Sequence, residues 1–245
     1  MATYAVILAA AGTSSRFHDQ HYKKPFALLN DRAVWLHSAD KFANRDDVKQ
    51  TILVISPDDR DAFNSKFAGS AAMMGIEVVD GGDQRADSVQ NALAHVKPNI
   101  DFVAVHDSAR PCIANEWIDK VFSAAEKSDA AILAIPVAGT LKRVRNGNIE
   151  ETVSRENLWE AQTPQVFRRQ LLMDAFAARG DSQPTDEAQL VEQFGHKVSV
   201  VEGSLINMKI TTKSDLHLAV HAMRALPKPK LSGPLHPFAD DDMWR

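Results

Sequence analysis

Three cations follow an apolar segment near the N-terminus, and their position suggests phosphate chemistry. The segment reads AVILAAAG (residues 5–12), and Arg16, Lys23 and Lys24 follow it within nine positions of one another. Small residues at the end of a strand allow a polyphosphate to approach the backbone, where successive N–H groups form an anion-binding nest. Mobile cations beside such a nest would attract a triphosphate. The pattern indicates a triphosphate site, although an ordinary strand-to-helix turn with solvated cations would also explain it.

A double glycine begins a second polar stretch, DGGDQRADSVQNAL (residues 80–93). Two glycines allow a flat ligand to lie against the backbone, and Asp83 and Ser88 could form hydrogen bonds to it. Capping of the following helix by Asp87 or Ser88 is an alternative, because short polar side chains are favoured at that position. Capping does not explain Asp83, Arg85 and the double glycine together, so the stretch favours ligand contact.

A third stretch, VAVHDSARPC (residues 103–112), brings His106 and Asp107 to the end of an apolar strand, with Arg110 three residues later. A carboxylate there suits Mg²⁺, which takes one or two protein oxygens and completes its shell with phosphate and water. A structural ion pair between Asp107 and Arg110 is the alternative, and the two roles are compatible. Asp107 is therefore the candidate metal ligand.

Strand-like apolar runs alternate with helical patterns along much of the chain. The stretches ADSVQNALAHV and EWIDKVFSAAEKS repeat apolar residues every three or four positions, as amphipathic helices do. Around them lie runs that are apolar on both faces: YAVILAA, QTILVIS, IEVVD, DFVAVHD and AAILAIPV. Such alternation predicts an α/β, Rossmann-like, mostly parallel sheet with helices on both faces. Ligands of these folds bind outside the carboxyl ends of the strands, where the three polar stretches begin.

The alternation changes after Pro136, where LKRVRNGNIEETV predicts two short strands joined by an Asn-Gly pair. Asn-Gly is favoured in tight hairpin turns, since both positions tolerate positive φ. This hairpin cannot form a core of its own, so we expect a projecting arm, about residues 138–163, that packs against a second copy. Residues 1–226 would form one domain with this arm. Residues 227–245 hold four prolines and an acidic triplet, which predicts an extended or disordered tail.

Composition and missing motifs exclude several other classes of protein. The formal net charge of −4 argues against nucleic acid as a partner, and no apolar run reaches the roughly 18 to 20 residues of a membrane span. The single cysteine, Cys112, permits no intrachain disulfide and agrees with a cytoplasmic location. The motifs GxxxxGK, GxGxxG and GxSxG are absent, and HLAVH lacks the glutamate of a zinc protease.

From about Tyr4 to Leu226 the chain resembles the 2-C-methyl-D-erythritol 4-phosphate cytidylyltransferase family. The resemblance is carried by LAAAGTSSRF, DGGDQRADSVQNAL, VHDSARP, TVSRENLWEAQTPQVF, TDEAQLVE and NMKITTKSDL. Each stretch is weak alone, and the first is shared loosely by many nucleotidyltransferases, but together and in this order they are specific. The resemblance implies a homodimeric enzyme of the non-mevalonate isoprenoid pathway. It would join CTP and methylerythritol phosphate, with Mg²⁺, and release pyrophosphate.

The resemblance also implies a role for each motif residue. Arg16 and Lys24 would be catalytic, because they would stabilise charge on the α-phosphate. The nucleotide would be bound by Ala10, Ala11, Gly12, Gly82, Asp83 and Ser88. The sugar phosphate would be bound by Asp107, Arg110, Thr140, Arg155, Thr185 and Lys209. Arg155 would reach in from the arm of a second copy, and Asp107 would also lie at the metal.

Two alternatives remain open at the level of sequence. A sister nucleotidyltransferase would share the fold and the first loop but would use another polyol phosphate, such as ribitol phosphate. A non-catalytic protein would bind the nucleotide in the same pocket and release no pyrophosphate with any sugar phosphate.

Overall fold

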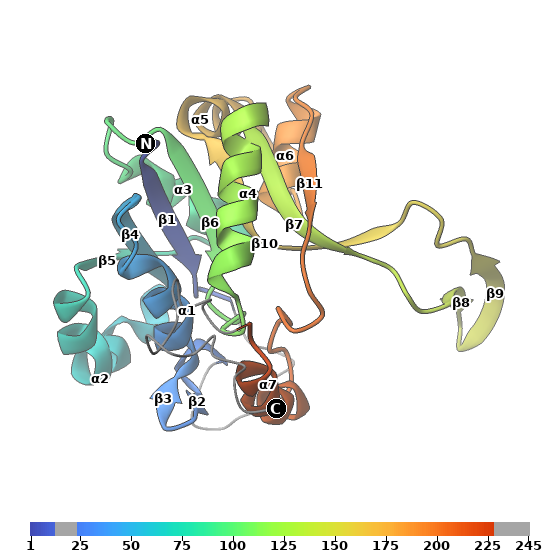
Figure 1. Ribbon diagram of the computed structural model, residues 1–245, viewed down its shortest axis with the longest axis horizontal. Helices are drawn as coiled ribbons and strands as arrows, with labels where there is room; N and C mark the ends of the chain where they lie inside the picture. The colour runs from blue at the N-terminus through green and yellow to red at the C-terminus, as the bar shows by residue number, and fades with distance from the viewer. Residues whose placement is uncertain (13–23, 228–245) are drawn as a thin grey trace, which may run out of the picture.

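The structure, a computed structural model, describes residues 1–12 and 24–227, and of Lys24 it describes the backbone alone. At the centre of this part of the chain is a seven-stranded sheet (Figure 1). From one edge to the other its strands are β11 (Ser199–Glu202), β7 (Ala130–Pro136), β10 (Trp159–Arg168), β6 (Phe102–Asp107), β1 (Tyr4–Ala9), β4 (Val48–Ile55) and β5 (Ile76–Asp80).

The sheet is mostly parallel, as the sequence predicts. β1 pairs in parallel with β4 and with β6, β4 pairs in parallel with β5, and β7 with β11. β10 is the exception, since it lies antiparallel between β6 and β7. The chain therefore returns from the arm directly into the middle of the sheet, a placement that the sequence analysis did not foresee.

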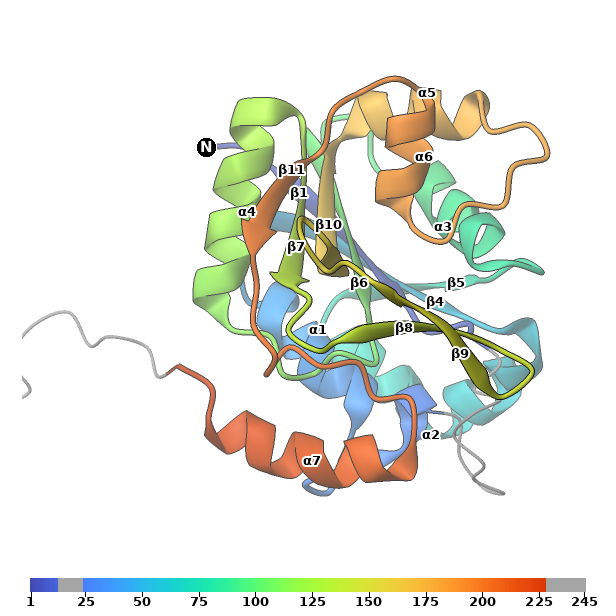
Figure 2. The ribbon, with the colours of Figure 1, turned by 90° about the vertical axis from the view of Figure 1, so that its right-hand side faces the viewer.

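Helices cover both faces of the sheet, which confirms the predicted α/β architecture. One face is covered by α1 (Val34–Ala43), α2 (Arg60–Met73) and α4 (Asn115–Ser128). The other face is covered by α3 (Arg85–Ala94), α5 (Arg169–Ala177) and α6 (Glu187–Gln193). Figure 2 shows α4 on one side of the sheet and α3, α5 and α6 on the opposite side.

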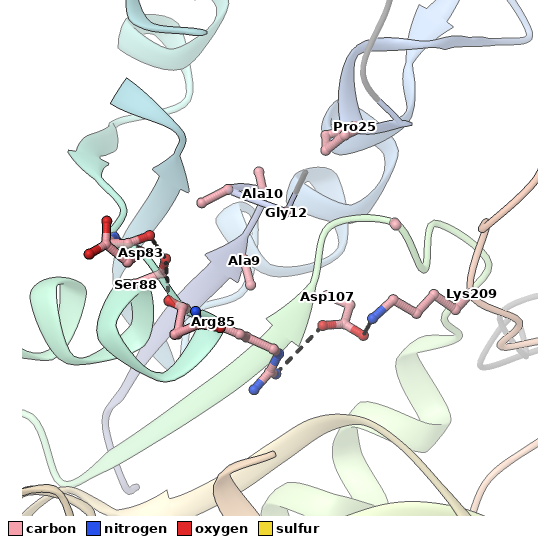
Figure 3. Close-up of a pocket in the computed structure, with 13 residues that line it drawn as sticks. Ala9, Ala10, Gly12, Pro25, Asp83, Arg85, Ser88, Asp107 and Lys209 are labelled. Carbon is pink, nitrogen blue, oxygen red and sulfur yellow. Dashed lines mark hydrogen bonds and ion pairs between the residues drawn. The ribbon is translucent and has the colours of Figure 1, made fainter. Parts of the chain in front are cut away.

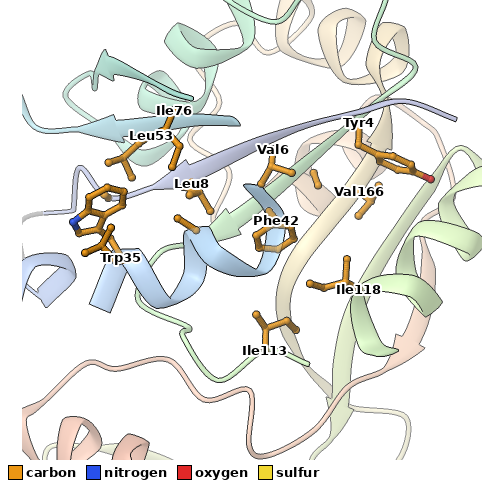
Figure 4. Packing of buried hydrophobic residues seen from close by; sticks show 14 of the residues in the cluster. Tyr4, Val6, Leu8, Trp35, Phe42, Leu53, Ile76, Ile113, Ile118 and Val166 are labelled. Atoms are coloured by element: carbon orange, nitrogen blue, oxygen red, sulfur yellow. The ribbon is translucent and has the colours of Figure 1, made fainter. Parts of the chain in front are cut away.

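The first strand shows why the central strands are apolar on both faces. Tyr4, Val6 and Leu8 of β1 belong to the core beneath α1 and α4, whereas the residues between them belong to the core beneath α3. In Figure 4, Val6 and Leu8 lie on the side of the sheet where Trp35 and Phe42 of α1 pack. Burying such side chains contributes about 1.5–3 kcal/mol each, so both layers fix the position of β1.

A smaller layer lies beyond the carboxyl edge of the sheet. It contains α7 (Lys213–Arg224), the short strands β2 (Leu28–Leu29) and β3 (Arg32–Ala33), and the 3-10 helix η1 (Lys24–Phe26). A second 3-10 helix, η2 (Pro57–Asp59), lies elsewhere, directly before α2. A capping box begins α7, since the Asp215 carboxylate accepts the N–H of Thr212 (2.8 Å) and the Thr212 hydroxyl accepts the N–H of Asp215 (3.2 Å). Just before it, Ile210 donates its N–H to Ala109 (2.8 Å). These bonds hold the segment around Lys209 against the end of β6.

The predicted hairpin arm is formed by β8 (Leu141–Arg145) and β9 (Asn148–Val153). Asn146 and Gly147 have φ of 50° and 79°, which confirms the tight turn expected from Asn-Gly. Figure 1 shows the arm projecting away from the sheet. Its predicted range, about residues 138–163, ends inside β10, because Trp159 already pairs with Pro136 of β7.

Two of the segments considered in the sequence lie outside the described residues: residues 13–23, which include Arg16, and residues 228–245 of the predicted tail. Within the described ranges, none of the helices has the length and apolar composition that a membrane-crossing segment needs.

Candidate functional site

Three chain segments leave the sheet side by side at its carboxyl edge. Ala10, directly after β1, donates its N–H to Val54 of β4 (2.8 Å), and Gly81, directly after β5, donates to Ile55 of β4 (2.7 Å). Ser108, directly after β6, donates to the last residue of β1 (3.1 Å). These bonds extend the ladder beyond the strands, so the three polar stretches of the sequence meet where ligands of such sheets bind.

A pocket of about 290 Å³ lies at this edge (Figure 3). Its walls combine the backbone of small residues with acidic, basic and hydroxyl side chains: Ala9, Ala10, Ala11, Gly12, Pro25, Gly82, Asp83, Gln84, Arg85, Ser88, Asp107, Ala109 and Lys209. The volume is close to the lower end of the range for small-molecule sites, roughly 300–1,000 Å³. The pocket thus has the size and the chemistry to receive a charged small molecule.

The double glycine lets the loop after β5 close against β1. A Cβ added at Gly81 would lie 2.6 Å from the Cβ of Ala11 and 2.8 Å from the Oγ of Ser88, and one at Gly82 would lie 2.5 Å from the Cβ of Asp87. The Ser88 hydroxyl accepts the N–H of Gly82 (3.1 Å). The sequence pattern suggests that the glycines make room for a flat ligand, whereas the protein's own packing already requires them.

Asp107, the last residue of β6, has three cations around it among the described residues. Its Oδ2 lies 2.8 Å from Nζ of Lys209 and 3.6 Å from Nε of Arg110, and its Oδ1 lies 3.6 Å from Arg85. Figure 3 shows Asp107 between Arg85 and Lys209. Burial alone would raise the pKa of Asp107, but these cations, Lys209 foremost, outweigh it and hold the pKa well below its usual range. Asp107 is therefore ionised.

The two arginines near Asp107 have different partners. Arg110 donates to the carbonyl of Asn207 (2.8 Å), and its Nε has no hydrogen-bond partner in the part of the chain that the structure describes. Burial lowers the pKa of Arg110. Burial acts on Arg85 in the same direction, but Glu187 and Asp107 outweigh it and raise the pKa of Arg85. Both guanidinium groups stay protonated, since arginine does not titrate near neutral pH.

His106 fixes the backbone around Asp107. Its Nε2 lies 3.1 Å from the carbonyl oxygen of Arg110, and its Nδ1 lies 3.1 Å from the hydroxyl of Thr163. The same hydroxyl accepts the N–H of Asp107 (3.0 Å). Burial lowers the pKa of His106 to about 4, so the ring is neutral. Nε2–H therefore donates to the carbonyl of Arg110, and Nδ1 accepts the hydrogen of Thr163.

The structure brings most of the predicted site residues into one place. The predicted residues that line the pocket are Ala10, Ala11, Gly12, Gly82, Asp83, Ser88, Asp107 and Lys209. Arg110 lies beside Asp107 but is not one of the residues that line the pocket. Of the predicted catalytic pair, Arg16 lies outside the described residues. Lys24 begins η1, next to Pro25 in the pocket wall, and its side chain also lies outside what the structure describes.

Thr140, Arg155 and Thr185 are exposed and are not part of the pocket wall. Thr140 precedes β8, and Arg155 follows β9, where its guanidinium donates to the carbonyl of Ala138. The Thr185 hydroxyl donates to Gln189 (3.1 Å) at the start of α6. The roles of these three residues toward a sugar phosphate stay predictions. The predicted role of Arg155 concerns the pocket of a second copy, not the pocket of its own chain.

Three buried polar residues support the site without having been singled out in the sequence: Thr163, Glu187 and Asn207. Asn207 donates from its amide to the carbonyl of Thr163 (2.9 Å), so two of them are linked. Each lies inside a motif quoted above, which was the available signal. Their partners are far away in the chain, so one polar residue in a motif could not reveal what it contacts.

Cys112 and the two histidines of HLAVH are not among the residues that line the pocket. Cys112 is buried, and burial raises the pKa of its thiol to about 11, so it is not an activated nucleophile. No group of three or more His, Cys, Asp and Glu that could hold a metal occurs among the described residues.

Fold and pocket together define an α/β protein with a charged small-molecule pocket at the carboxyl edge of a mostly parallel sheet. The family model of 2-C-methyl-D-erythritol 4-phosphate cytidylyltransferase (IspD) matches residues 4–225. The chain therefore belongs to this family, a family of transferases of the isoprenoid pathway, which confirms the resemblance found in the motifs.

Named relatives agree with this placement. A 2-C-methyl-D-erythritol 4-phosphate cytidylyltransferase of Rhodopirellula baltica is 40% identical over 229 residues, which is 89% of this chain and 93% of the relative. One from Bacillus cereus is 38% identical over 218 residues, or 88% and 96% of the two chains. Among solved structures, the Francisella tularensis enzyme of that name superposes with a TM-score of 0.77 at 32% identity, covering 90% of this chain and 100% of the other. The Thermus thermophilus enzyme gives 0.75 at 30% identity, covering 91% and 100%.

Proposed function

We propose that this protein transfers the cytidylyl group of CTP to 2-C-methyl-D-erythritol 4-phosphate and releases pyrophosphate. The observation that carries the proposal is the Asp107 carboxylate with three described cations within 3.6 Å of it, next to the Ala10–Gly12 backbone and the loop after β5. Family membership supports the choice of the two substrates.

The reaction is an in-line displacement at the α-phosphorus of CTP. A phosphate oxygen of the sugar substrate forms a bond to that phosphorus while the bond to the bridging oxygen of the β-phosphate breaks, and pyrophosphate leaves with the electron pair. The attacking oxygen is already anionic, so no general base is required. The barrier consists of repulsion between two anions and of charge that develops on the transferring and leaving oxygens. Positioning and fixed cations therefore supply the catalysis.

The residues of the site divide between the two substrates. Lys209 and Arg110 would bind the sugar phosphate beside Asp107. Arg16 and Lys24 would stabilise charge on the α-phosphate, since both come soon after β1 in the sequence and the backbone directly after β1 lines the pocket. The triphosphate and the cytosine would be bound by Ala10, Ala11 and Gly12, and by Gly82, Asp83 and Ser88, respectively.

The donor set at the pocket fits Mg²⁺ bound jointly with a nucleotide. Mg²⁺ usually takes one or two carboxylates and completes its shell with substrate phosphates and water. Asp107 is an ionised carboxylate in the pocket wall, and it would be the protein ligand. A metal bound there would neutralise part of the triphosphate charge. Lys209, now 2.8 Å from the carboxylate, would then bind phosphate instead.

A homodimer would complete the sugar-phosphate side of the site. Val144 and Ile149 pair near the turn of the arm and are 58% and 62% exposed, so the arm carries apolar surface that the described part of the chain leaves exposed. Arg155 at the base of the arm is exposed and does not line the pocket of its own chain. Both observations support an arm that reaches a second copy and delivers Arg155 to its pocket.

We also propose a cytoplasmic location. The single cysteine is buried and reduced, and a chain without disulfides agrees with a reducing compartment.

A pyrophosphate-release assay with CTP, Mg²⁺ and methylerythritol phosphate tests the proposed activity. ATP, GTP and UTP replace CTP in parallel reactions, and ribitol phosphate replaces the sugar phosphate. Release that requires CTP and methylerythritol phosphate together is expected. Faster release with ribitol phosphate would instead identify a sister enzyme, and CTP binding without release in any mixture would identify a non-catalytic protein.

The assignment of Lys24 is tested by Lys24→Ala, with Lys120→Ala on the exposed side of α4 as the matched control. Loss of one fixed cation at the transition state should lower turnover on the order of a hundredfold or more, with unchanged thermal unfolding. Near-normal turnover of Lys24→Ala would remove this residue from the mechanism.

A further inference from the structure

Arg85 connects the nucleotide side of the pocket to a buried carboxylate outside it. The residue begins α3 directly after the loop that carries the double glycine, and its side chain lines the pocket. Its two terminal nitrogens donate to the two oxygens of Glu187, at 2.5 Å and 3.0 Å. The Glu187 side chain is 2% exposed, and it begins α6 on a distant part of the chain. A bidentate pair of this kind fixes both the place and the orientation of a guanidinium.

The second carboxylate near Arg85 is Asp107. The Arg85–Asp107 distance is 3.6 Å, longer than either contact with Glu187, and Asp107 is paired more closely with Lys209 at 2.8 Å. Arg85 therefore lies beside Asp107 without forming its principal ion pair. A guanidinium that lost Glu187 would keep its charge, because arginine does not deprotonate near neutral pH, and it would turn to Asp107.

A second ion pair joins the start of α3 to the α5–α6 region. In this pair the acidic residue is on α3 and the basic residue is on the other side. Asp87, in the first turn of α3, lies 2.6 Å from Arg179, which follows α5. This pair lowers the pKa of Asp87. The start of α3 is thus held twice against the α5–α6 region, so Glu187 and Arg85 keep a defined separation from Asp107.

We propose that Glu187 is a positioning residue of this enzyme, which acts through Arg85 to keep Asp107 available to the reacting phosphates. Glu187 touches neither the pocket nor the reacting atoms. It holds the Arg85 guanidinium where it contributes positive charge to the pocket, and it prevents a close Arg85–Asp107 pair that would occupy the carboxylate. The inference rests on the proposed cytidylyl transfer.

The test is Glu187→Gln, which keeps the shape of the side chain and removes its charge. Loss of a supporting partner of a reactive group typically costs ten- to a hundredfold. We expect kcat to fall by about that factor, while KM for CTP changes less than threefold. A purely electrostatic effect of Glu187 would give a different result. Removing one negative charge near the pocket would then lower KM for CTP and leave kcat unchanged. A purely structural role would lower thermal stability and leave kcat per folded enzyme unchanged.

A double-mutant cycle with Arg85→Met decides whether Glu187 acts through Arg85. Arg85→Met alone should lower kcat, and adding Glu187→Gln to it should cause less than a twofold further loss. If Glu187→Gln alone does not fold, the comparison of Arg85→Met with the double variant still tests the inference, because the double variant contains no unpaired buried charge. Asp129→Asn is the matched control, as it removes the Arg168–Asp129 pair (2.6 Å) far from the pocket.

The outcomes separate this inference from the proposed function. A wild-type protein without pyrophosphate release would overturn the proposed function and this inference with it. An active wild type whose Glu187→Gln variant keeps kcat within twofold would overturn the positioning role alone. Independent, multiplying losses in the double variant would overturn it as well, because Glu187 would then act by another route.

Discussion

The burial of His106, beside Asp107, leads to a quantitative prediction about how the free energy of unfolding depends on pH. His106 is fully buried, and burial lowers its pKa to about 4 from an ordinary value of about 6.5. As the pH falls, the unfolded chain takes up the proton before the folded protein does. The stability that depends on a neutral ring is therefore complete above pH 6.5 and is lost as the pH falls towards about 4.

The size of this loss follows from the two pKa values. They differ by about 2.5, and each unit of pKa difference corresponds to about 1.4 kcal/mol, so the full effect is about 3–4 kcal/mol. Proton uptake by the unfolded chain is already large at pH 5, where the loss is about 2 kcal/mol. This is a large part of the 5–15 kcal/mol that typically stabilises a folded domain, so it is measurable.

Denaturant unfolding at pH 7, 6 and 5 measures the effect as a difference between wild type and His106→Gln. The glutamine amide can still donate to the carbonyl of Arg110, but it does not titrate, and all other histidines are shared and cancel. The wild type should lose about 2 kcal/mol relative to the variant between pH 7 and pH 5. His217→Gln, exposed on α7, is the control and should follow the wild type. A constant difference over this range would mean that the folded ring accepts a proton, which would refute the hydrogen bond from Thr163 to Nδ1.

Two further predictions concern the elements that hold the pocket. Gly81→Ala should lower stability by about 1–3 kcal/mol and raise KM for CTP, because its Cβ would lie 2.6 Å from that of Ala11. Gly69→Ala has nothing within 4 Å and lies inside α2, so equilibrium unfolding should show it stabilised by about 0.5–1 kcal/mol; equal effects of the two changes would contradict the packing argument. Asp215→Ala should cost about 1–2 kcal/mol at pH 7, because the capping box of α7 is lost. Hydrogen bonds from Thr211 and Thr212 outweigh burial and lower the pKa of Asp215, so this cost should be present above pH 4 and vanish as the pH falls through the lowered pKa.

Strands that are buried on both faces could be predicted from their apolar runs. β1, β4, β6 and β7 are almost continuous apolar runs, because helices cover them on two sides. β10 escaped prediction because its sequence, WEAQTPQVFR, is half polar and contains Pro164. Proline cannot donate to a ladder, and the pairing of β10 with β7 is indeed interrupted between Ala161 and Gln165. Its central position results from tertiary packing that no local pattern contains.

In the candidate site, too, local sequence patterns reveal some residues, whereas others depend on tertiary contacts. Residues at the end of a strand or shortly after it, such as Asp107, Gly82 and Asp83, could be placed in one pocket because parallel strands end at one edge. Glu187 and Thr163 could not, because their roles depend on partners 102 and 56 residues away. Arg85 is intermediate, since its motif suggested ligand contact and only the structure gives its pairing with Glu187.

The ion pairs around Asp107 explain how cations can be assembled before any substrate binds. Cations held close together without anions would repel each other, and removing them even partly from water would be costly. Asp107 and Glu187 offset this cost among the described residues, since Lys209 pairs with the first and Arg85 with the second. Under the proposed function, an arriving phosphate would replace Asp107 as the partner of Lys209, so this cation would exchange one anion for another. Glu187 is out of reach of such exchange because it is buried behind Arg85, and Arg85 therefore keeps its place throughout. The Lys209–Asp107 pair would thus be exchangeable and the Arg85–Glu187 pair permanent. Together they would keep the empty pocket stable and still offer positive charge to an entering phosphate. Such preorganised charge is what phosphoryl transfer requires.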